Sequence, residues 1–144
     1  MKILILNGPN LSRLDLRETS YYGDLDYSQL KNAIENRATE LKIEVEIKQS
    51  DSESELISWL HEAADKKQPV IINPAAFTHY SYAIRDAVSM LTAPVIEVHL
   101  SNPLSREEFR HTSVVSGVVN GTIAGFGAQI YCWVRRSAPN NTSC

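Results

Sequence analysis

Short apolar runs alternate along the chain with longer amphipathic segments. The apolar runs are rich in β-branched residues and are bounded by polar or turn-forming residues, a pattern typical of buried strands. They cover Lys2–Leu6, Ile43–Lys48, Pro69–Ile72 and Pro94–Leu100. In the intervals between them, apolar residues recur every three or four positions, which predicts one amphipathic helix in each interval. These stripes cover Leu30–Leu41, Leu56–Ala64 and Ala83–Leu91.

Two of the predicted helices carry a start signal. Asp26 and Ser52 precede the first and second stripes, with Gln29 and Glu55 three residues further on. An oxygen-bearing side chain at the N-cap, followed by Glu or Gln at the third helical position, is the pattern of a capping box. We therefore expect these helices to begin directly behind Asp26 and Ser52.

The alternation of strand and helix predicts an α/β fold with right-handed crossovers. A mostly parallel sheet covered by helices on both faces follows, and we expect a flavodoxin-like doubly wound sheet. The last third is less regular: we predict a helical turn at Ser105–Phe109, a final strand at Val114–Val119 and an apolar helix at Thr122–Val134. Residues 1–136 are expected to form a single domain, with residues 137–144 as a frayed tail.

Polar residues follow the end of each predicted strand. They are Asn7 with Asn10, Gln49 with Ser50 and Asp51, Asn73 with Thr78 and His79, and Glu97 with His99, Ser101 and Asn102. Doubly wound sheets bind ligands beyond the carboxyl ends of their strands, so these residues are expected to share one site. Turn and cap chemistry alone explains any single loop, but four such loops together favour a site.

Glu97 and His99 carry the most specific chemistry. They lie two apart on a predicted strand and therefore share one face, while Ile96, Val98 and Leu100 occupy the other. A carboxylate beside an imidazole fixes its tautomer and stabilises its protonated form, as an acid catalyst needs. An edge strand with one wet face would show the same pattern. His79, taken without its neighbours, fits a structural histidine at a helix start.

A long segment, Leu11–Leu25, separates the first strand from the first helix. It contains Arg13, Arg17, Tyr21 and Tyr22 but little that could form a core. Long loops in compact domains are often lids over a site. A solvated loop, or one that contacts another subunit, is the alternative.

Composition narrows the function classes. The chain has 144 residues, 43% of them hydrophobic, which suits one domain with a single core. Its formal charge of −3 gives no basis for nucleic-acid binding, so an anionic ligand must be drawn by local charge. No apolar run suggests a membrane span, and the run from Ile3 to Leu6 is too short for a secretory signal, so a cytoplasmic location is expected.

Several chemistries lack their motifs. The sequence contains no phosphate-binding P-loop, no glycine-rich turn after the first strand and neither an H-E-x-x-H nor a C-x-x-C pair. Cys132 and Cys144 form neither a disulfide framework nor a metal pattern. Lys48 is the only lysine near the binding edge, so a Schiff-base mechanism has no obvious lysine. We expect neither a metal nor a cofactor.

Four segments, in this order, carry a family resemblance. They are N-G-P-N-L at Asn7–Leu11, R-E and Y-G within Arg17–Gly23, N-P-x-A-x-T-H-x-S at Asn73–Ser81, and I-E-V-H-L-S-N from Ile96 followed by R-E-E-F-R through Arg110. Together they resemble the type II 3-dehydroquinate dehydratases over nearly the whole chain. The resemblance implies anti elimination of water from 3-dehydroquinate to 3-dehydroshikimate through an enolate, without metal, cofactor or covalent lysine.

The resemblance also implies residue roles. Tyr22 would be the general base that takes the C2 proton, Arg17 would favour its ionised form, and Asn10 would help to hold the enolate. His99, oriented by Glu97, would protonate the departing hydroxyl. The substrate-binding residues would be Asn73, His79, Leu100, Ser101 and Arg110, with Arg106 a second candidate near the lid. Family members assemble as dodecamers built from trimers, and Asp86 matches an aspartate that reaches a neighbour's site.

The sequence departs from the family pattern at three positions. Ser12 and Asp15 replace the commoner Asn and Gly in the lid segment, and Ala75 stands where Gly is frequent. These positions bear on lid conformation, because Gly tolerates backbone angles that Asp largely does not.

Two other functions stay open on the sequence. One is a non-catalytic flavodoxin-like binding or signalling domain, although a receiver-type domain would show clustered acidic residues after the first strand. The other is a hydro-lyase that acts on a related cyclic hydroxy-keto acid. Biosynthetic and catabolic use share one chemistry and are not distinguished by the residues.

Overall fold

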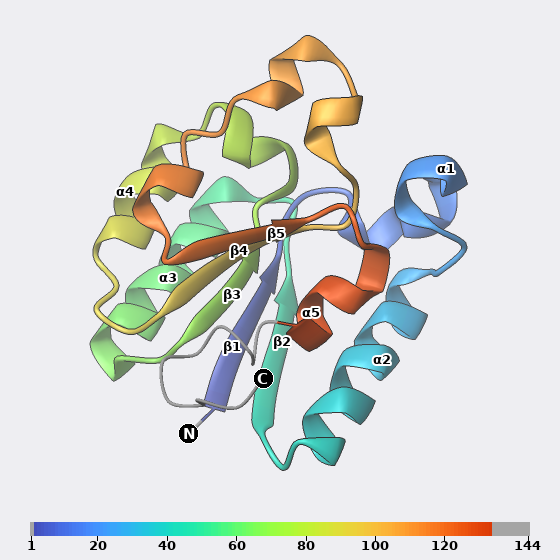
Figure 1. Cartoon of the computed structure of the whole chain (residues 1–144). Helices are drawn as coiled ribbons and strands as arrows, with labels where there is room; N and C mark the ends of the chain where they lie inside the picture. The colour runs from blue at the N-terminus through green and yellow to red at the C-terminus, as the bar shows by residue number, and fades with distance from the viewer. Residues whose placement is uncertain (1, 134–144) are drawn as a thin grey trace.

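The computed structural model describes residues 2–133 and contains a five-stranded, wholly parallel sheet (Figure 1). The strand order is β2-β1-β3-β4-β5, the order of flavodoxin-like doubly wound sheets, so the predicted fold class is confirmed. The strands are β1 Lys2–Asn7, β2 Glu44–Gln49, β3 Val70–Asn73, β4 Val95–His99 and β5 Gly121–Ala124.

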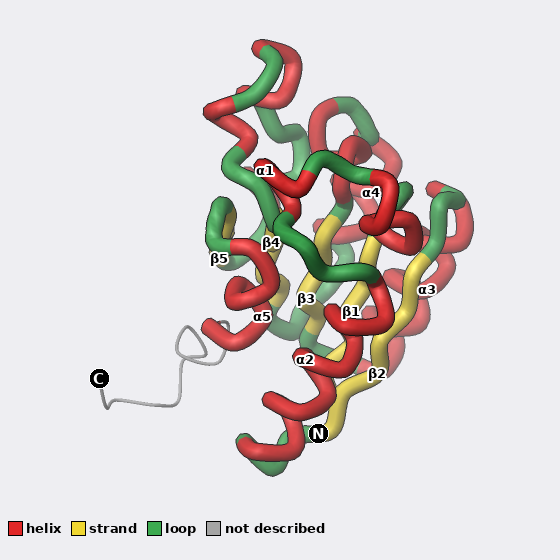
Figure 2. Tube along the Cα trace, turned by 90° about the vertical axis from the view of Figure 1, so that its right-hand side faces the viewer, coloured by secondary structure: helices red, strands yellow, loops and turns green. Residues whose placement is uncertain are grey.

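Helices cover both faces of the sheet (Figures 1 and 2). On one face α2 (Tyr27–Glu40) and α5 (Ile130–Trp133) bury Leu30, Ile34 and Ile130 against alternate strand residues such as Ile5 and Ile71. On the other face lie α3 and α4, which cover Glu53–Lys66 and Tyr82–Ser89. The strand residues of opposite parity face these two helices, as the period of two in a β-strand requires.

Short helical segments occupy the end of the sheet where the strands terminate (Figures 1 and 2). They are α1 Thr19–Tyr22 and the 3-10 helices η1 Leu11–Leu16, η2 Ala75–His79, η3 Pro103–Ser105, η4 Glu108–His111 and η6 Gly127–Gln129. A further 3-10 helix, η5 Ser116–Val118, lies beside α4 and leads into the start of β5 (Figure 1). Within residues 2–133, no helix has the length and apolar character that crossing a membrane requires.

The predicted helix starts are confirmed. Asp26 accepts a hydrogen bond from the Gln29 N–H, and the Gln29 side chain accepts one from the Asp26 N–H, so the capping box is complete. Ser52 accepts from the Glu55 N–H at 3.3 Å and caps α3. These caps satisfy N–H groups that a helix start leaves without an intrahelical partner.

The predicted strand at Val114–Val119 is wrong. The segment is a loop that contains η5, because the Ser113 hydroxyl accepts hydrogen bonds from the N–H groups of Val115 and Ser116 and turns the chain there. The apolar pattern of this segment reflects packing and not strand formation: its valines pack on the core on the α3 and α4 side of the sheet, where Val115 is fully buried.

The predicted helix at Thr122–Val134 is also wrong over its first half. The chain forms β5 at Gly121–Ala124, which pairs with β4, and α5 begins only at Ile130. Gly125 and Gly127 have φ values of 93° and 58°, which prevent a continuous α-helix between the strand and α5, so that only the short 3-10 helix η6 precedes α5. Val134 and the predicted tail at residues 137–144 lie outside the described residues.

Candidate active site

A cleft opens at the carboxyl ends of the strands, where the topology predicts a binding site. Its walls come from the loops after β1, β3 and β4, from the η1–α1 segment and from η4. The lining residues are Pro9, Asn10, Leu11, Arg17, Tyr22, Asn73, Ala75, Ala76, His79, His99, Leu100, Ser101, Pro103, Arg106 and Arg110.

Most of the residues proposed from the sequence meet in this cleft. Among the residues to which the family resemblance gave a role, two lie elsewhere: Glu97 is buried behind His99, and Asp86 is exposed on α4, away from the cleft of its own chain. The others are among the lining residues, and so is Arg106. The structure therefore brings together groups from the connections that follow β1, β3 and β4. The expectation that all polar residues behind the strands share the site is wrong for those that do not line the cleft: Asn7, Gln49, Ser50, Asp51, Thr78 and Asn102.

The loops after β1 and β3 are packed against each other. The Gly8 N–H donates to the Asn73 carbonyl at 2.8 Å, and a Cβ at Gly8 would lie 2.7 Å from the Pro74 carbonyl oxygen, so only glycine permits this approach. Asn10 has a left-handed φ of 69°, and its N–H donates to Asp51 Oδ1 at 2.8 Å. Asp51, on the loop after β2, thus holds the backbone that presents the Asn10 amide.

Asn73 and Ala75 form the turn that leads from β3 into η2. Asn73 is 3% exposed, and its Oδ1 accepts from the Ala75 N–H at 3.1 Å. Ala75 has a φ of 51°, which explains physically why glycine is frequent there. Asp15, by contrast, is not among the described residues with a positive φ and accepts two hydrogen bonds of 3.0 Å from Arg13. The lid segment therefore needs no glycine at position 15.

His79 is oriented by the backbone of a neighbouring loop. Its Nδ1 lies 2.8 Å from the Thr112 carbonyl oxygen, which can only accept, so Nδ1 carries a hydrogen. Burial lowers the pKa of His79 below its ordinary value, although the bond to Thr112 and the Glu97 charge act in the opposite direction. In the neutral form of the ring, Nε2 is therefore the nitrogen that can accept a hydrogen bond.

His99 and Glu97 form an ion pair at the end of β4. His99 Nε2 lies 2.6 Å from Glu97 Oε2, and the Glu97 side chain is 0% exposed. Burial by itself raises the pKa of Glu97, but hydrogen bonds from His99, Ser116 and Thr78 outweigh it and hold the pKa below its usual range. The alternative of a wet edge strand is wrong, because β4 lies between β3 and β5 and Glu97 is fully buried.

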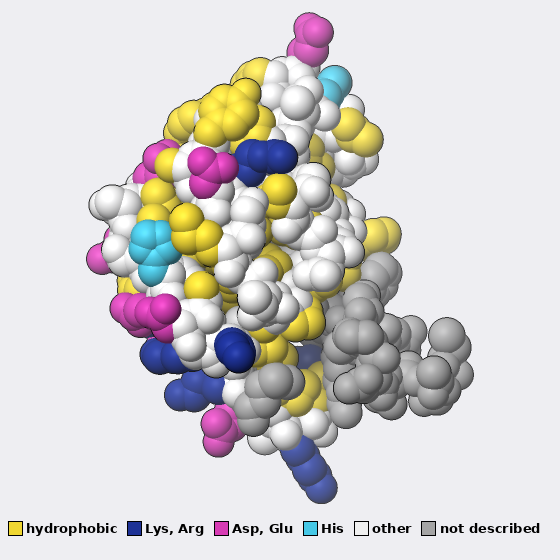
Figure 3. All heavy atoms as spheres, turned by 90° about the vertical axis from the view of Figure 1, so that its left-hand side faces the viewer, with side chains coloured by type: hydrophobic (Ala, Val, Ile, Leu, Met, Phe, Trp, Pro, Cys, Tyr) yellow, Lys and Arg dark blue, Asp and Glu magenta, His cyan; other side chains and the backbone are white. Residues whose placement is uncertain are grey.

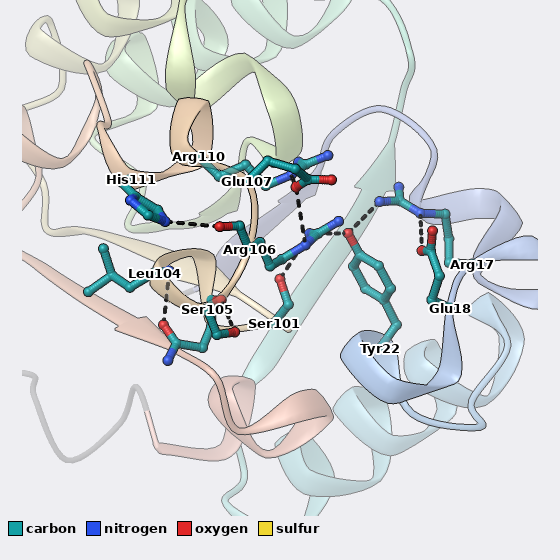
Figure 4. Close-up of polar contacts among 11 residues, drawn as sticks. Arg17, Glu18, Tyr22, Ser101, Leu104, Ser105, Arg106, Glu107, Arg110 and His111 are labelled. Carbon is teal, nitrogen blue, oxygen red and sulfur yellow. Dashed lines mark hydrogen bonds and ion pairs between the residues drawn. The ribbon is translucent and has the colours of Figure 1, made fainter.

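Tyr22 meets two arginines from opposite sides (Figure 4). Arg17 donates from Nη2 to the Tyr22 oxygen, and Arg106 donates from Nη1 to the same oxygen at 2.6 Å. Arg106 also donates to Ser101 Oγ at 3.2 Å, and its side chain is only 6% exposed. Two charge-assisted hydrogen bonds therefore converge on one phenol oxygen.

The cleft is cationic although the chain is not. Arg17, Arg106 and Arg110 line it, whereas their carboxylate partners, Glu18 and Glu107, have side chains 65% and 58% exposed at the rim. Exposed ion pairs are weakened by solvent, so the positive charge inside the cleft is only partly offset. The local field therefore favours an anionic ligand despite the net charge of −3.

Sequence reasoning missed part of this arrangement. It gave Arg106 a secondary place and gave no role to Ser113, Ser116 or the Thr78 hydroxyl. Ser113 and Ser116 lie in the loop before β5 and Thr78 lies in η2, so no single motif contains them. It also held that Leu11–Leu25 adds little to the core, which is wrong for Leu11 and Leu14, each 3% exposed and packed on the α2 face. In the sequence, only the spacing of three between Leu11 and Leu14 could have predicted that both side chains pack on one face.

The described residues offer no metal centre. Between residues 2 and 133, no group of three or more His, Cys, Asp or Glu side chains is placed to hold a metal ion.

Comparison with known proteins adds to this geometry. The family model described as dehydroquinase class II matches residues 1–137. The chain is 53% identical over 131 residues to a 3-dehydroquinate dehydratase of Mycobacteroides abscessus, covering 91% of each protein, and 52% identical to one of Salinispora tropica, covering 91% of this chain and 92% of that protein.

Solved structures agree with this match. The type II dehydroquinase of Propionibacterium acnes superposes with a TM-score of 0.91 at 50% identity, covering 94% of each chain. That of Butyrivibrio crossotus superposes with a TM-score of 0.92 at 45% identity, covering 95% of this chain and 96% of the other.

Proposed function

This chain belongs to the class II dehydroquinase family, and we propose from that premise that it is a hydro-lyase which converts 3-dehydroquinate into 3-dehydroshikimate in the shikimate pathway. One observation carries the proposal at the level of the site. A tyrosine oxygen that accepts from two arginines shares a single cleft with a histidine paired to a buried carboxylate. A base and an acid in one cationic cleft are what elimination of water from an anionic keto-acid requires.

Tyr22 starts the reaction in this mechanism. Its phenolate takes the proton from C2, which is acidified by the neighbouring ketone, and the electron pair moves onto the ketone oxygen to give an enolate. Arg17 and Arg106 stabilise the phenolate before the transfer. Asn10, held by Asp51, offers its amide to the enolate oxygen, directly or through water.

His99 completes the elimination. The enolate returns its electron pair to form the carbon–carbon double bond, and the C1–oxygen bond breaks. The departing hydroxyl takes a proton from His99 and leaves as water. Tyr22 lies on α1 and His99 at the end of β4, so base and acid come from different elements of the cleft, which suits an anti elimination.

The substrate's carboxylate and hydroxyls are bound by the remaining residues. Asn73, the last residue of β3, and the Leu100–Ser101 segment, directly after β4, offer an amide, a hydroxyl and backbone N–H groups. His79 accepts from one ring hydroxyl through Nε2, and Arg110 donates to another. The expected consequence for His99→Ala is a loss of rate together with some affinity, and a wild-type rate would remove His99 from the role of acid.

We also propose a homo-oligomer, a dodecamer of trimers, in which Asp86 reaches a neighbour's cleft. Tyr82, Asp86 and Met90 are spaced by four and share one exposed side of α4, where Tyr82 is 68% and Met90 56% exposed. Figure 3 shows apolar atoms among the charged ones on the side of the molecule that faces left in Figure 1. Light scattering coupled to gel filtration tests the assembly. The cytoplasmic location stays a prediction.

The product's conjugated enone provides the test of function. Purified protein with 3-dehydroquinate should produce the ultraviolet absorbance of 3-dehydroshikimate, and the rate should survive borohydride and EDTA treatment. Loss on borohydride would indicate a lysine Schiff base, and loss on EDTA a metal. Absence of turnover would overturn the proposal and favour the non-catalytic domain, which binding of flavin or Mg²⁺ would then support. Competition by quinate and dehydroshikimate distinguishes a hydro-lyase for a related keto-acid.

A further inference from the structure

The buried carboxylate of Glu97 receives hydrogen bonds from three sides. Oε2 accepts from the Thr78 hydroxyl at 2.5 Å and faces His99 Nε2 at 2.6 Å, and Oε1 accepts from the Ser116 hydroxyl at 2.5 Å. A carboxylate without water is costly to ionise unless donors surround it. The two hydroxyls come from η2 and η5, elements far apart in the sequence that meet only behind His99.

The direction of these hydrogen bonds follows from Ser113. Its oxygen accepts from the N–H groups of Val115 at 3.1 Å and Ser116 at 2.9 Å, so its own hydrogen points to the Thr78 oxygen, 2.6 Å away. The Thr78 oxygen therefore accepts from Ser113, and its hydrogen is directed to Glu97. A protonated Glu97 would oppose this order, whereas an ionised Glu97 completes it.

We infer that Thr78 and Ser116 are positioning residues for the acid His99: they keep Glu97 an anion that only accepts, which fixes the hydrogen on His99 Nε2 and leaves Nδ1 as the nitrogen that delivers the catalytic proton. This inference rests on the proposed function for its catalytic meaning. The tautomer itself follows from the hydrogen bonds alone, because an acceptor-only carboxylate requires a donor at Nε2.

The proton balance is then defined atom by atom. Nδ1–H of the doubly protonated ring gives its proton to the departing hydroxyl as the C1–oxygen bond breaks with its electron pair on oxygen. Water leaves, and His99 is neutral with Nε2–H still bound to Glu97. Before the next turnover Nδ1 regains a proton from solvent, and Tyr22 releases to solvent the proton that it took from C2.

Other charged groups in the neighbourhood do not replace the hydroxyls. His79 interacts electrostatically with Glu97 and His99, and Arg110 interacts with His79, but neither is a hydrogen-bond partner of Glu97 within residues 2–133. Loss of a hydroxyl donor therefore leaves His99 to hold a less stabilised carboxylate. Because hydrogen bonds from Ser116 and Thr78 lower the pKa of Glu97, their removal raises it.

The tautomer is tested first, in the wild-type protein and without substrate. Two-bond proton–nitrogen correlation spectra of ¹⁵N-histidine-labelled protein, recorded above neutral pH and assigned with His99→Gln, report which ring nitrogen carries hydrogen. The expected result is a protonated Nε2 and an unprotonated Nδ1. A protonated Nδ1 in neutral His99 overturns the inference, even if the protein is an active dehydratase.

Variants then test the two hydroxyls. Thr78→Val and Ser116→Ala should each lower kcat about tenfold or more, as expected for a lost hydrogen bond to a charged group, with KM changed far less. The acidic limb of the kcat–pH profile should move to higher pH. Thr78→Ser and Ser116→Thr restore the hydroxyl and should return both values toward wild type. Ser58→Ala, which removes an exposed hydroxyl on α3, is the control.

Several outcomes count against these positioning roles. Equal loss in Thr78→Val and Thr78→Ser would indicate packing only, and an unchanged pH profile in both hydroxyl-deleted variants would do the same. If Thr78→Val does not fold, Ser116→Ala, at a partly exposed position, decides the matter together with the wild-type tautomer. Failure of wild type to dehydrate 3-dehydroquinate would overturn the proposed function but leave the tautomer result standing.

Discussion

Tyr21 and Tyr22 are neighbours in α1 but meet different surroundings. The Tyr22 oxygen accepts from Arg17 and Arg106, whereas Tyr21 presents its ring to the Arg106 guanidinium, 4.6 Å from the ring centroid. Phenylalanine preserves the ring in both places and removes only the hydroxyl. Comparing Tyr22→Phe with Tyr21→Phe therefore distinguishes a loss of acid–base chemistry from a change in packing.

We expect Tyr22→Phe to lower kcat by about 10³-fold, within the range for loss of a general base, while substrate affinity stays nearly intact. Steady-state rates and calorimetric titration with substrate measure the two effects. Tyr21→Phe should keep kcat within about twofold, because it leaves the arginine–ring contact in place. Wild-type activity in Tyr22→Phe would remove Tyr22 as the base.

Arg106 is the residue whose importance the sequence understated. Its buried guanidinium joins the Tyr22 oxygen to Ser101, so it ties the lid segment to the end of β4. We expect Arg106→Met to reduce kcat/KM by about 10- to 100-fold, because a charge-assisted bond to the phenol oxygen is lost. Arg13 lies in the lid segment itself, in η1, and its side chain is 60% exposed, so Arg13→Met should have little effect on kcat/KM. Equal effects of the two substitutions would point to lid folding rather than to Tyr22.

At the scale of elements, the C-terminal end of α3 has an unfavourable backbone conformation at Lys67, which a substitution can remove. Lys67 caps the helix with a left-handed φ of 52°, and the Gln68 N–H donates to the Ala63 carbonyl at 2.9 Å. This is the geometry that favours glycine, and Lys67 is exposed, so little packing is at stake.

We expect Lys67→Gly to raise the free energy of unfolding by about 1 kcal/mol, because glycine adopts this backbone without the Cβ penalty. Lys66→Gly, one position earlier and inside the helix, should lower it by about 1 kcal/mol. Urea unfolding of both variants measures the difference. Two changes of the same sign would show that the cap conformation is not what decides stability there.

The elements that could be predicted were those whose residues carry a local signal. The apolar runs and capped stripes located four strands and three helices to within a few residues, because burial and capping act on adjacent positions. The segment from Val114 to Trp133 had no such agreement between pattern and structure. Val115 is apolar because it packs on α3 and α4, and β5 is short and pairs only with β4. Both facts depend on distant elements.

The candidate site divides in the same way. Residues at strand ends or shortly after them, such as Asn73, His99 and Asn10, were predictable because the topology places all strand ends at one edge. The contacts of Thr78 and Ser116 with Glu97 were not, because each spans 19 positions and follows no spacing rule. The hydrogen bonds that position the buried Glu97 carboxylate can therefore be identified only from the folded structure, and not from the sequence motifs around it.

At the scale of the whole molecule, one hydrogen bond joins the two ends of the described chain. Tyr131 on α5 donates its hydroxyl to Asn7 Oδ1 at the end of β1, at 2.6 Å and 124 residues apart in sequence. Both side chains are buried, and burial raises the pKa of the Tyr131 phenol above its ordinary value. The free energy of unfolding therefore depends on pH in the alkaline range, where the Tyr131 phenol titrates in the unfolded chain before it titrates in the folded protein.

The direction of the pH effect on stability follows from proton binding. A phenol whose pKa is raised in the folded state contributes its full stability at pH values below its pKa in the unfolded chain, near 10. It loses that stability as pH rises through its pKa in the folded state, because the unfolded chain releases the proton first.

We expect Tyr131→Phe to be less stable than wild type by about 1 kcal/mol at pH 7, where it lacks the hydrogen bond to Asn7. Above about pH 10 wild type should lose up to about 1.4 kcal/mol more per pH unit than the variant, so the difference shrinks and then reverses. Urea unfolding from pH 7 to 11.5 measures this, with Tyr80→Phe, at a position 59% exposed, as the matched control. A difference between wild type and Tyr131→Phe that stays constant over this range would mean that the phenol titrates alike in both states, and that α5 does not bury it in solution.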